Sequence, residues 1–254
     1  MSTAVQTAPE VRLEAAQVSS ARIAADGKFL RITPGPGADT RVATAGRHPE
    51  AQSAQAVAGE RFLVKGVTYG TFAPDSHGYQ FPPLHQLSED FRLMAALGAN
   101  TVRTYTPPHR DLLDEAARHG LRVMVGLPWS QHVAFLDDAR LKRGIRLEIA
   151  SKVAELKDHP AVLAVALGNE IPPGVVRWHG RVRVERFLRS LYLDAKAAAP
   201  DTLFTYVNFP PTEFLDLPFF DICAFNVYLH REPELRAYLA RLQHIAGHKP
   251  LPLT

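Results

Sequence analysis

The stretch AVLAVALGNE, residues 161–170, decides the fold of this chain. Residues 161–168 carry no polar side chain, which is typical of a parallel strand that helices cover on both faces. The stretch ends in Asn169 and Glu170, an amide followed by a carboxylate. In parallel barrels the functional side chains stand at the carboxyl ends of the strands. The stretch therefore predicts a buried parallel strand with an acid just past its end.

Similar short apolar runs recur along the chain, and helical patterns separate them. The expected strands are 62–69, 100–105, 121–127, 161–168, 203–207, 222–227 and a run that starts at 251. Ser88 is expected to cap the first helix and Gly98 to end it. The following helices are expected to end at Gly120, near 156, at Pro200 and at Gly247. Strands that alternate with helices predict an α/β fold with a parallel sheet.

The spacing of the strands favours a barrel over an open sheet. No glycine-rich phosphate-binding turn follows any expected strand, so a doubly wound nucleotide-binding fold lacks its fingerprint. One strand-helix unit takes about 31 residues, so eight units need about 250 residues beyond residue 61. Residues 61–254 are therefore predicted to be a (β/α)8 TIM barrel that is incomplete at its carboxyl end, with about six units and the start of strand seven.

Residues 1–60 have a different composition. The segments 1–20 and 34–59 are rich in Ala, Gln and Ser, and we expect a flexible N-terminal extension there. Between them, residues 21–32 predict a small hairpin, because Asp26-Gly27 suits a type I′ turn. Such a hairpin could cap the bottom of the barrel.

Composition narrows the class of protein. Of the 254 residues, 46% are hydrophobic and 22% charged, as in globular proteins, and the net charge is only +3. The Arg residues are spread over several expected helices, which argues against nucleic-acid binding. Without an apolar leader or a span of about 18 apolar residues, we expect a cytoplasmic chain that does not insert into a membrane. Cys223 is expected to be a buried, inert thiol.

Metal and Schiff-base chemistry have little support in the sequence. The eleven His residues show no close ligand spacing such as H-E-x-x-H, so no metal and no other cofactor is expected. Lys65 is expected to lie inside a strand instead of at its end, which argues against an aldolase lysine.

The expected strand ends carry hydrogen-bonding and aromatic side chains, as a sugar site does. These residues are Tyr69, Arg103, Tyr105, Trp129, Asn169, Glu170, Asn208, Asn226 and Tyr228. Glycosidic cleavage needs one carboxyl group to protonate the leaving oxygen and a second to attack or to activate water. Glu170 fits the first role, and Asn169 fits a contact to the sugar 2-hydroxyl.

Each of these residues also has a structural reading. Glu170 could cap the next helix, Asn169 could be a turn residue, and Arg103 could pair within the barrel instead of steadying a second carboxylate. Trp129 fits a sugar platform and a loop anchor equally well. Tyr228 has the same two readings, with the site slightly favoured over an anchoring role.

Four motifs resemble the strand motifs of clan A retaining glycoside hydrolases, in particular the family 2 TIM-barrel domain. They are VKGV at 64–67, GANTVR at 98–103, ALGNEIP at 166–172 and FNVY at 225–228. The resemblance covers about residues 60–254. It extends to bacterial proteins in which such a domain precedes a family 2 glycosyltransferase that builds an exopolysaccharide or glucan.

The resemblance implies Glu170 as the acid/base, Asn169 as the 2-hydroxyl partner, Arg103 as a support near the nucleophile and Tyr228 as a partner of that nucleophile. It places the nucleophile in a Leu-Thr-Glu context at the end of strand seven. The sequence stops at Leu253-Thr254, so we expect a truncated domain that lacks the nucleophile and is inactive by itself.

The leading function is therefore a retaining β-glycosidase or transglycosylase domain that acts on a β-glucan or exopolysaccharide. Its expected partners are an oligo- or polysaccharide and, in a longer parent, an attached glycosyltransferase. A non-catalytic carbohydrate-binding domain and a scaffold domain of a polysaccharide synthase remain as alternatives. The sugar, the linkage and the choice between hydrolysis and transfer stay open.

Overall fold

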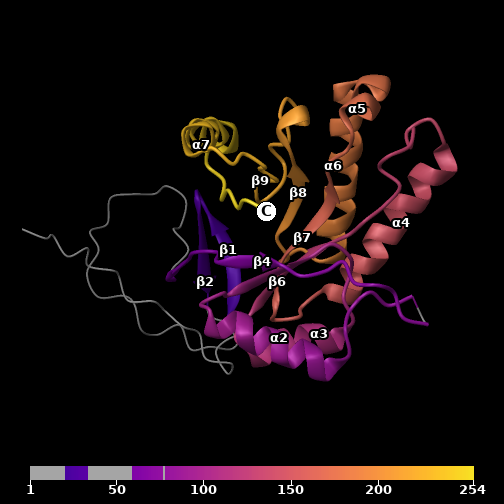
Figure 1. Cartoon of the computed structure of the whole chain (residues 1–254). Helices are drawn as coiled ribbons and strands as arrows, with labels where there is room; N and C mark the ends of the chain where they lie inside the picture. Colours follow the sequence, from indigo (N-terminus) through magenta and orange to yellow (C-terminus); the bar gives the residue numbers. More distant parts are fainter. Residues whose placement is uncertain (1–20, 34–58, 77) are drawn as a thin grey trace, which may run out of the picture.

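The computed structural model describes residues 21–33, 59–76 and 78–254, and its centre is a curled sheet of six parallel strands (Figure 1). The strands are β4 (Gly66–Thr68), β5 (Thr101–Thr104), β6 (Arg122–Gly126), β7 (Val162–Asn169), β8 (Phe204–Asn208) and β9 (Ala224–Phe225). Their order in the sheet is their order in the sequence. A doubly wound sheet would reverse direction at a switch point. The predicted α/β barrel is therefore confirmed.

The segment 250–254 begins a seventh strand position beside β9. Backbone amides of Cys223 and Phe225 donate to the carbonyls of Pro250 and Pro252, at 3.0 and 3.3 Å, and Thr254 donates back to Phe225 at 2.9 Å. No hydrogen-bonded ladder joins this segment to β4 within the described residues. The described strands thus form an incomplete (β/α)8 barrel.

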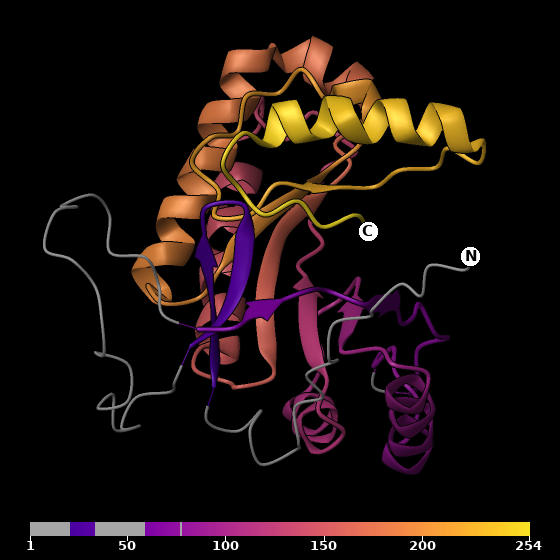
Figure 2. The ribbon, with the colours of Figure 1, turned by 90° about the vertical axis from the view of Figure 1, so that its left-hand side faces the viewer.

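Helices cover the outer face of the sheet (Figures 1 and 2). They are α2 (Leu84–Ala96), α3 (Arg110–Arg118), α4 (Ala139–Leu156), α5 (Pro173–His179), α6 (Arg181–Ala198) and α7 (Glu232–Ala246), with a 3₁₀ turn η1 (Pro210–Thr212). Side chains of the strands alternate between this layer and the barrel interior. Val123, Val125 and Val165 pack under the helices, whereas Met124 and Ala166 face inward.

Two expectations about helices were wrong. The first helix starts at Leu84 after Pro83, and the Ser88 hydroxyl contacts His119 instead of capping the helix. Its end agrees with the prediction, because Gly98 adopts a φ of +88° and the amide of Ala99 bonds back to the Met94 carbonyl. Helix α5, which was not predicted, has Pro173 in its first turn and ends at Gly180.

The first predicted strand, 62–69, is split between two sheets. Arg61–Phe62 (β3) pairs with the hairpin, and Gly66–Thr68 (β4) pairs with β5. The Asn100 side chain holds the crossing segment, since it accepts from the Lys65 amide at 2.9 Å and donates to the Leu63 carbonyl at 2.8 Å. Lys65 therefore lies between the sheets and not inside a strand.

A hairpin of β1 (Arg22–Asp26) and β2 (Phe29–Thr33) joins β3 in a three-stranded antiparallel sheet. Its buried residues Ile23 and Leu30 pack with Phe62 against Leu163, Leu203 and Ile222, at the amino ends of the barrel strands. The predicted type I′ turn was wrong. Gly27 has a φ of +55° while Lys28 has no positive φ, the sign pattern of a type II′ turn.

Two further expectations concern flexible segments and membrane insertion. The segments 1–20 and 34–58, expected to be flexible, lie outside the described residues. Within the described part of the chain, the helices are all too short or too polar to cross a bilayer.

We predict that Leu30→Ala lowers the free energy of unfolding by about 2–5 kcal/mol, because it opens a cavity between the hairpin and the barrel. Phe29→Ala is the matched control. Its ring is 41% exposed and lies under the Arg61 guanidinium, so the expected loss is below about 1 kcal/mol. Chemical denaturation measures both. Equal losses would mean that the hairpin does not seal the barrel bottom.

Candidate active site

A β-bulge at the end of β7 sets the direction of the site residues. Ala166 pairs with Thr205 but Asn169 pairs with Val207, so β7 has one residue more than β8 over this interval. Gly168 lies at the bulge with a φ of +152°, and a Cβ there would approach Trp129 Nε1 to 3.1 Å. The bulge turns the Asn169 side chain into the barrel interior, where strict alternation would have turned it toward the helices.

Glu170 follows the bulge with a left-handed φ of +50°, unusual for a residue with a side chain. Its backbone amide donates to the Val207 carbonyl at 2.9 Å, which keeps the residue on the strand end. Its Oε1 accepts hydrogen bonds from Asn226 Nδ2 at 2.6 Å and from the Tyr228 hydroxyl at 3.0 Å. No described residue donates to Oε2, so that oxygen is left for a ligand.

The Asn226 carboxamide is the centre of the site. Its Nδ2 also donates to Asn169 Oδ1 at 3.1 Å, and its Oδ1 accepts from Arg103 Nη1 at 3.0 Å and from Thr254 Oγ1 at 2.7 Å. Donors face the oxygen and acceptors face the nitrogen, so all four bonds agree with one orientation of the amide. The side chain is buried.

Arg103 is a buried cation on β5. Its Nη2 donates to Asn169 Oδ1 at 2.7 Å, and the guanidinium lies 4.6 Å from the centre of the Tyr105 ring. Burial lowers the pKa of Arg103, and nearby Tyr105, Tyr228 and Glu170 oppose that shift. No ion pair joins Arg103 to a carboxylate among the described residues. Because an unpaired buried charge is costly, the position suits an anion.

Tyr228 differs from the other site residues because 63% of its side-chain surface is exposed. Partial burial and then the hydrogen bond to Glu170 raise its pKa. The phenol therefore stays protonated and donates to the carboxylate.

Two cavities open beside these residues. One of about 410 Å³ is lined by residues of the loops after β5 and β6 together with Arg103 and Asn169. The other, about 520 Å³, lies in the barrel interior between β4, the hairpin and the segment 250–254. Neither lining contains an Asp or a Glu. Among the described residues, Glu170 is the carboxylate that hydrogen-bonds to the Asn226 carboxamide.

Gln131, which the sequence pattern did not single out, lies in the loop after β6. Its Oε1 accepts from the Asn169 amide at 3.1 Å, and its Nε2 donates to the Asn169 carbonyl. The buried Gln131 side chain thus makes the hydrogen bonds to the Asn169 backbone that a neighbouring strand would otherwise make at the bulge. A polar residue within the strand-end loop was the only sequence signal.

Trp129 lies in the same loop, two residues before Gln131. Its Nε1 donates to the Leu167 carbonyl at 2.9 Å, and its ring packs edge-on against Phe135 and Phe187. It contributes to neither cavity beside Asn169. These contacts support the loop-anchor reading, and the sugar-platform role stays a prediction.

Two other candidates do not reach Glu170. Tyr69 donates to Asp90 Oδ2 at 2.5 Å and packs against Phe91 beneath α2. Asn208 points away from the barrel interior because the preceding Val207 points inward, and its side chain accepts from the Thr212 hydroxyl at 2.7 Å and donates to the Thr212 carbonyl at 3.1 Å. Strand alternation could have predicted the direction of Asn208.

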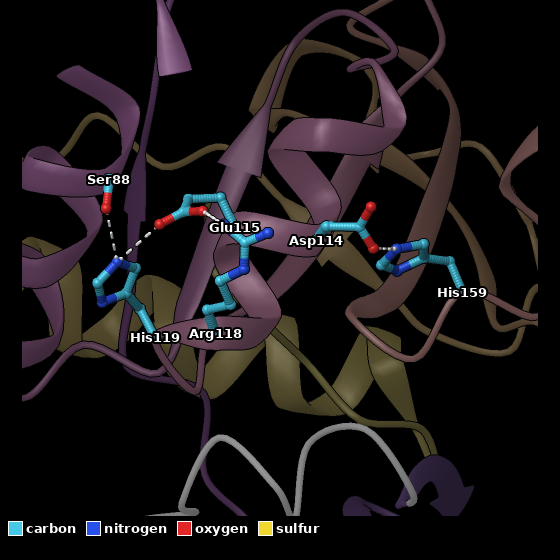
Figure 3. Close-up of polar contacts among 6 residues, drawn as sticks. All are labelled: Ser88, Asp114, Glu115, Arg118, His119 and His159. Carbon is cyan, nitrogen blue, oxygen red and sulfur yellow. Dashed lines mark hydrogen bonds and ion pairs between the residues drawn. The ribbon is translucent and has the colours of Figure 1, made fainter. Parts of the chain in front are cut away.

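A second polar cluster, between α2 and α3, contains the residue types of a serine hydrolase triad (Figure 3). Ser88 and Glu115 both contact the same nitrogen of His119, Nε2, at 3.2 and 3.0 Å. A relay needs its serine and its acid on different ring nitrogens. Burial raises the pKa of Glu115, but Ser88, Arg118 and His119 outweigh it and lower the pKa overall. The cluster therefore joins two helices and does not form a nucleophile.

A nearby contact, from His159 to Asp114 at 3.1 Å, fixes the loop before β7 in the same way (Figure 3). Across the described residues, no three His, Cys, Asp or Glu side chains gather closely enough to hold a metal ion. Cys223 is partly buried, and burial raises its pKa to about 11, so it is a thiol at neutral pH.

The fold and the site describe a parallel barrel that presents a carboxylate, two amides and a buried Arg at its carboxyl end. The model of the glycosyl hydrolases family 2 TIM barrel domain matches residues 51–250. The chain therefore belongs to this family. A sequence comparison with curated proteins finds no match.

Solved structures of similar fold include two β-glucuronidases and a β-galacturonidase. Bifidobacterium dentium β-glucuronidase complexed with coumarin-3-O-glucuronide has a TM-score of 0.69 at 18% identity. Ruminococcus gnavus β-glucuronidase with a C6-substituted uronic isofagomine has 0.68 at 14%, and Eisenbergiella tayi family 2 β-galacturonidase bound to galacturonate has 0.68 at 15%. Each match covers 92% of this chain, and the chain spans 35 to 38% of the length of these proteins.

We predict that Gln131→Ala lowers the free energy of unfolding by about 1–3 kcal/mol, since two buried backbone groups of Asn169 lose their partner. Amide hydrogen exchange in the segment 166–172 should rise by a matching factor, and exchange in α2 should stay unchanged. Unchanged protection of 166–172 would show that Gln131 does not hold the strand end.

We expect Trp129→Ala to cost about 3 kcal/mol of stability, near the low end for a Trp, because the ring is only partly buried. If Trp129 were a sugar platform, the variant would melt like the wild-type chain and bind glycans more weakly. A melting scan and a glycan-binding measurement on the same sample separate the two roles.

Proposed function

We propose that this chain carries the acid/base half of a retaining β-glycosidase or transglycosylase, with Glu170 as the acid/base. The observation that carries the proposal is the Glu170 carboxylate, fixed at Oε1 by Asn226 and Tyr228 and free at Oε2. A proton on Oε2 would pass to the glycosidic oxygen as the bond from C1 breaks. The same oxygen would later take the proton of the incoming water or sugar hydroxyl.

The two ends of the Asn169 carboxamide differ in their contacts, and this difference supports the proposal. Its Oδ1 is occupied by Arg103 and Asn226, whereas its Nδ2 has no described partner. An amide N–H held in this way can donate to a sugar 2-hydroxyl, a contact that strengthens in the transition state.

The second carboxylate of a retaining mechanism would lie where Arg103 and Asn226 meet Thr254. A carboxylate that follows Thr254 in a longer chain, or that a second chain provides, would face the buried Arg103 charge across the sugar from Glu170. Retaining enzymes separate their two carboxyl groups by about 5–5.5 Å. The proposal assigns the nucleophile to this place, and it includes the prediction that 1–254 by itself does not hydrolyse glycosides.

The substrate class belongs to the same proposal. We keep a β-glucan or exopolysaccharide as the substrate, with a glycosyltransferase attached in a longer parent. Two of the structural neighbours bind a glucuronide and galacturonate. Uronic acids therefore belong among the sugars to test. The cytoplasmic location stays a prediction.

One observation favours a second candidate, a carbohydrate-binding or scaffold domain without chemistry. Glu170 is the carboxylate at the site, and the two adjacent cavities add no other. Such a domain would bind a glycan and leave it intact.

An α-glycosyl fluoride distinguishes the candidates, because it resembles the covalent intermediate of a retaining mechanism and reacts without an enzyme nucleophile. We predict that the chain transfers glucose or glucuronic acid from the α-fluoride to an aryl β-glucoside. The acceptor oxygen attacks C1, fluoride leaves, and Glu170 takes the acceptor proton. The product is a β-linked disaccharide that mass spectrometry detects.

Glu170→Gln should reduce this transfer by about 10²–10⁴-fold, the usual contribution of general base help. Glu148→Gln, on the outer surface of α4, is the matched control and should transfer like wild type. A folded wild-type chain that transfers neither sugar, or a Glu170→Gln variant with full activity, would contradict the proposed chemistry. Glycan binding without transfer would support the binding domain instead.

A further inference from the structure

The chain has two Trp residues, and the second, Trp178 on α5, lies in a very different environment from Trp129. Its side chain is 72% exposed, the largest exposure of any aromatic residue in the described chain. Its indole Nε1 nevertheless donates to Asp137 Oδ2 at 2.6 Å. The edge of the ring is therefore fixed while most of its surface is open to solvent.

The Asp137 carboxylate lies beside His179 and Arg183. His179 Nε2 accepts from the Leu136 amide at 3.4 Å, so the proton of the neutral ring is on Nδ1, which lies 3.6 Å from Asp137 Oδ1, beyond hydrogen-bond distance. Burial lowers the pKa of His179, which keeps the ring neutral. Arg183 adds a cation at 3.7 Å from the same oxygen. The indole of Trp178 thus donates to a carboxylate that has a cation nearby.

The position of Trp178 connects it with Glu170. Helix α5 begins three residues after Glu170, and in Figure 1 it lies at the upper end of α6, beside the loop that precedes α4. That loop carries both Gln131, which holds the Asn169 backbone, and Asp137, which holds Trp178. Chain geometry limits the separation of Glu170 and Trp178 to about 18 Å. An oligosaccharide of several units covers such a distance.

We propose that Trp178 is a stacking platform for a distal pyranose unit of a glycan whose reacting end lies at Glu170. This inference rests on the proposed function and adds that the ligand is an oligomer. An exposed indole offers a flat apolar face, and the C–H face of a pyranose is its natural complement. Fixing the ring before binding reduces the entropy lost when the sugar docks. The flanking residues Arg177 and Arg181 are charged, which suits a hydroxylated ligand.

The test measures binding of β-linked gluco-, galacto- and glucurono-oligosaccharides of two to six units to the 1–254 chain. Wild type should bind at least one series more tightly as the chain lengthens. Trp178→Ala should weaken binding of the longest member about tenfold or more and leave the disaccharide within about twofold. Because the ring is exposed, the melting temperature should not change.

Two variants are controls. Leu147→Ala removes a side chain that is 66% exposed on α4, away from the strand-end loops, and should bind all lengths like wild type. Trp178→Phe keeps an aromatic face but loses the hydrogen bond to Asp137, so its loss should fall between those of wild type and Trp178→Ala.

The outcomes separate this inference from the proposed chemistry. Length-dependent binding that Trp178→Ala removes supports the platform even if no glycosyl fluoride reacts. Transfer from a glycosyl fluoride with identical binding by wild type and Trp178→Ala overturns the platform but not the role of Glu170. A folded chain that binds no oligosaccharide, or that self-associates through Trp178, also overturns the inference.

Discussion

The carboxamide of Asn226 holds the carboxyl end of this barrel together. It connects Arg103 on β5, the two residues at the end of β7 and Thr254 through two hydrogen bonds donated by its nitrogen and two accepted by its oxygen. The carboxyl ends of the strands surround the barrel interior. Side chains that reach across the interior therefore connect one strand end with another. In a buried position the loss of one partner leaves the others unsatisfied, so these residues act as a unit.

The two ends of the barrel have different tasks. At the amino ends, the hairpin residues Ile23 and Leu30 pack against apolar strand residues. At the carboxyl ends, Arg103 and Asn226 are buried with polar partners, and the loops leave Glu170 Oε2 free. This division is general in parallel barrels, where stability and chemistry lie at opposite faces.

The loop between β6 and α4 links the site to the surface. Trp129 fastens it to β7, Gln131 continues the strand pairing at the bulge, and Asp137 fixes Trp178. One loop therefore positions the acid-bearing strand end and the proposed distal sugar platform. The contacts of Trp129 anchor this loop, whereas Trp178 on α5 is exposed to solvent.

The sequence by itself determined the α/β barrel, the order of its strands and the position of Glu170 after β7. Apolar runs and helical periodicity are local properties, so they survive without knowledge of the rest of the chain. The helix end at Gly98 is another local property. The positive φ of this residue lets the amides at the helix end bond to the last carbonyls of the helix.

Tertiary structure alone decided which polar residues meet at the site. Tyr69 follows a strand as Asn226 does, yet its side chain contacts Asp90 on α2, and a bulge at Gly168 turns Asn169 inward. The register of β7 against β8 fixes these directions, since one extra residue reverses the face of every side chain that follows. Register depends on the packing of neighbouring strands, which no single stretch of sequence contains.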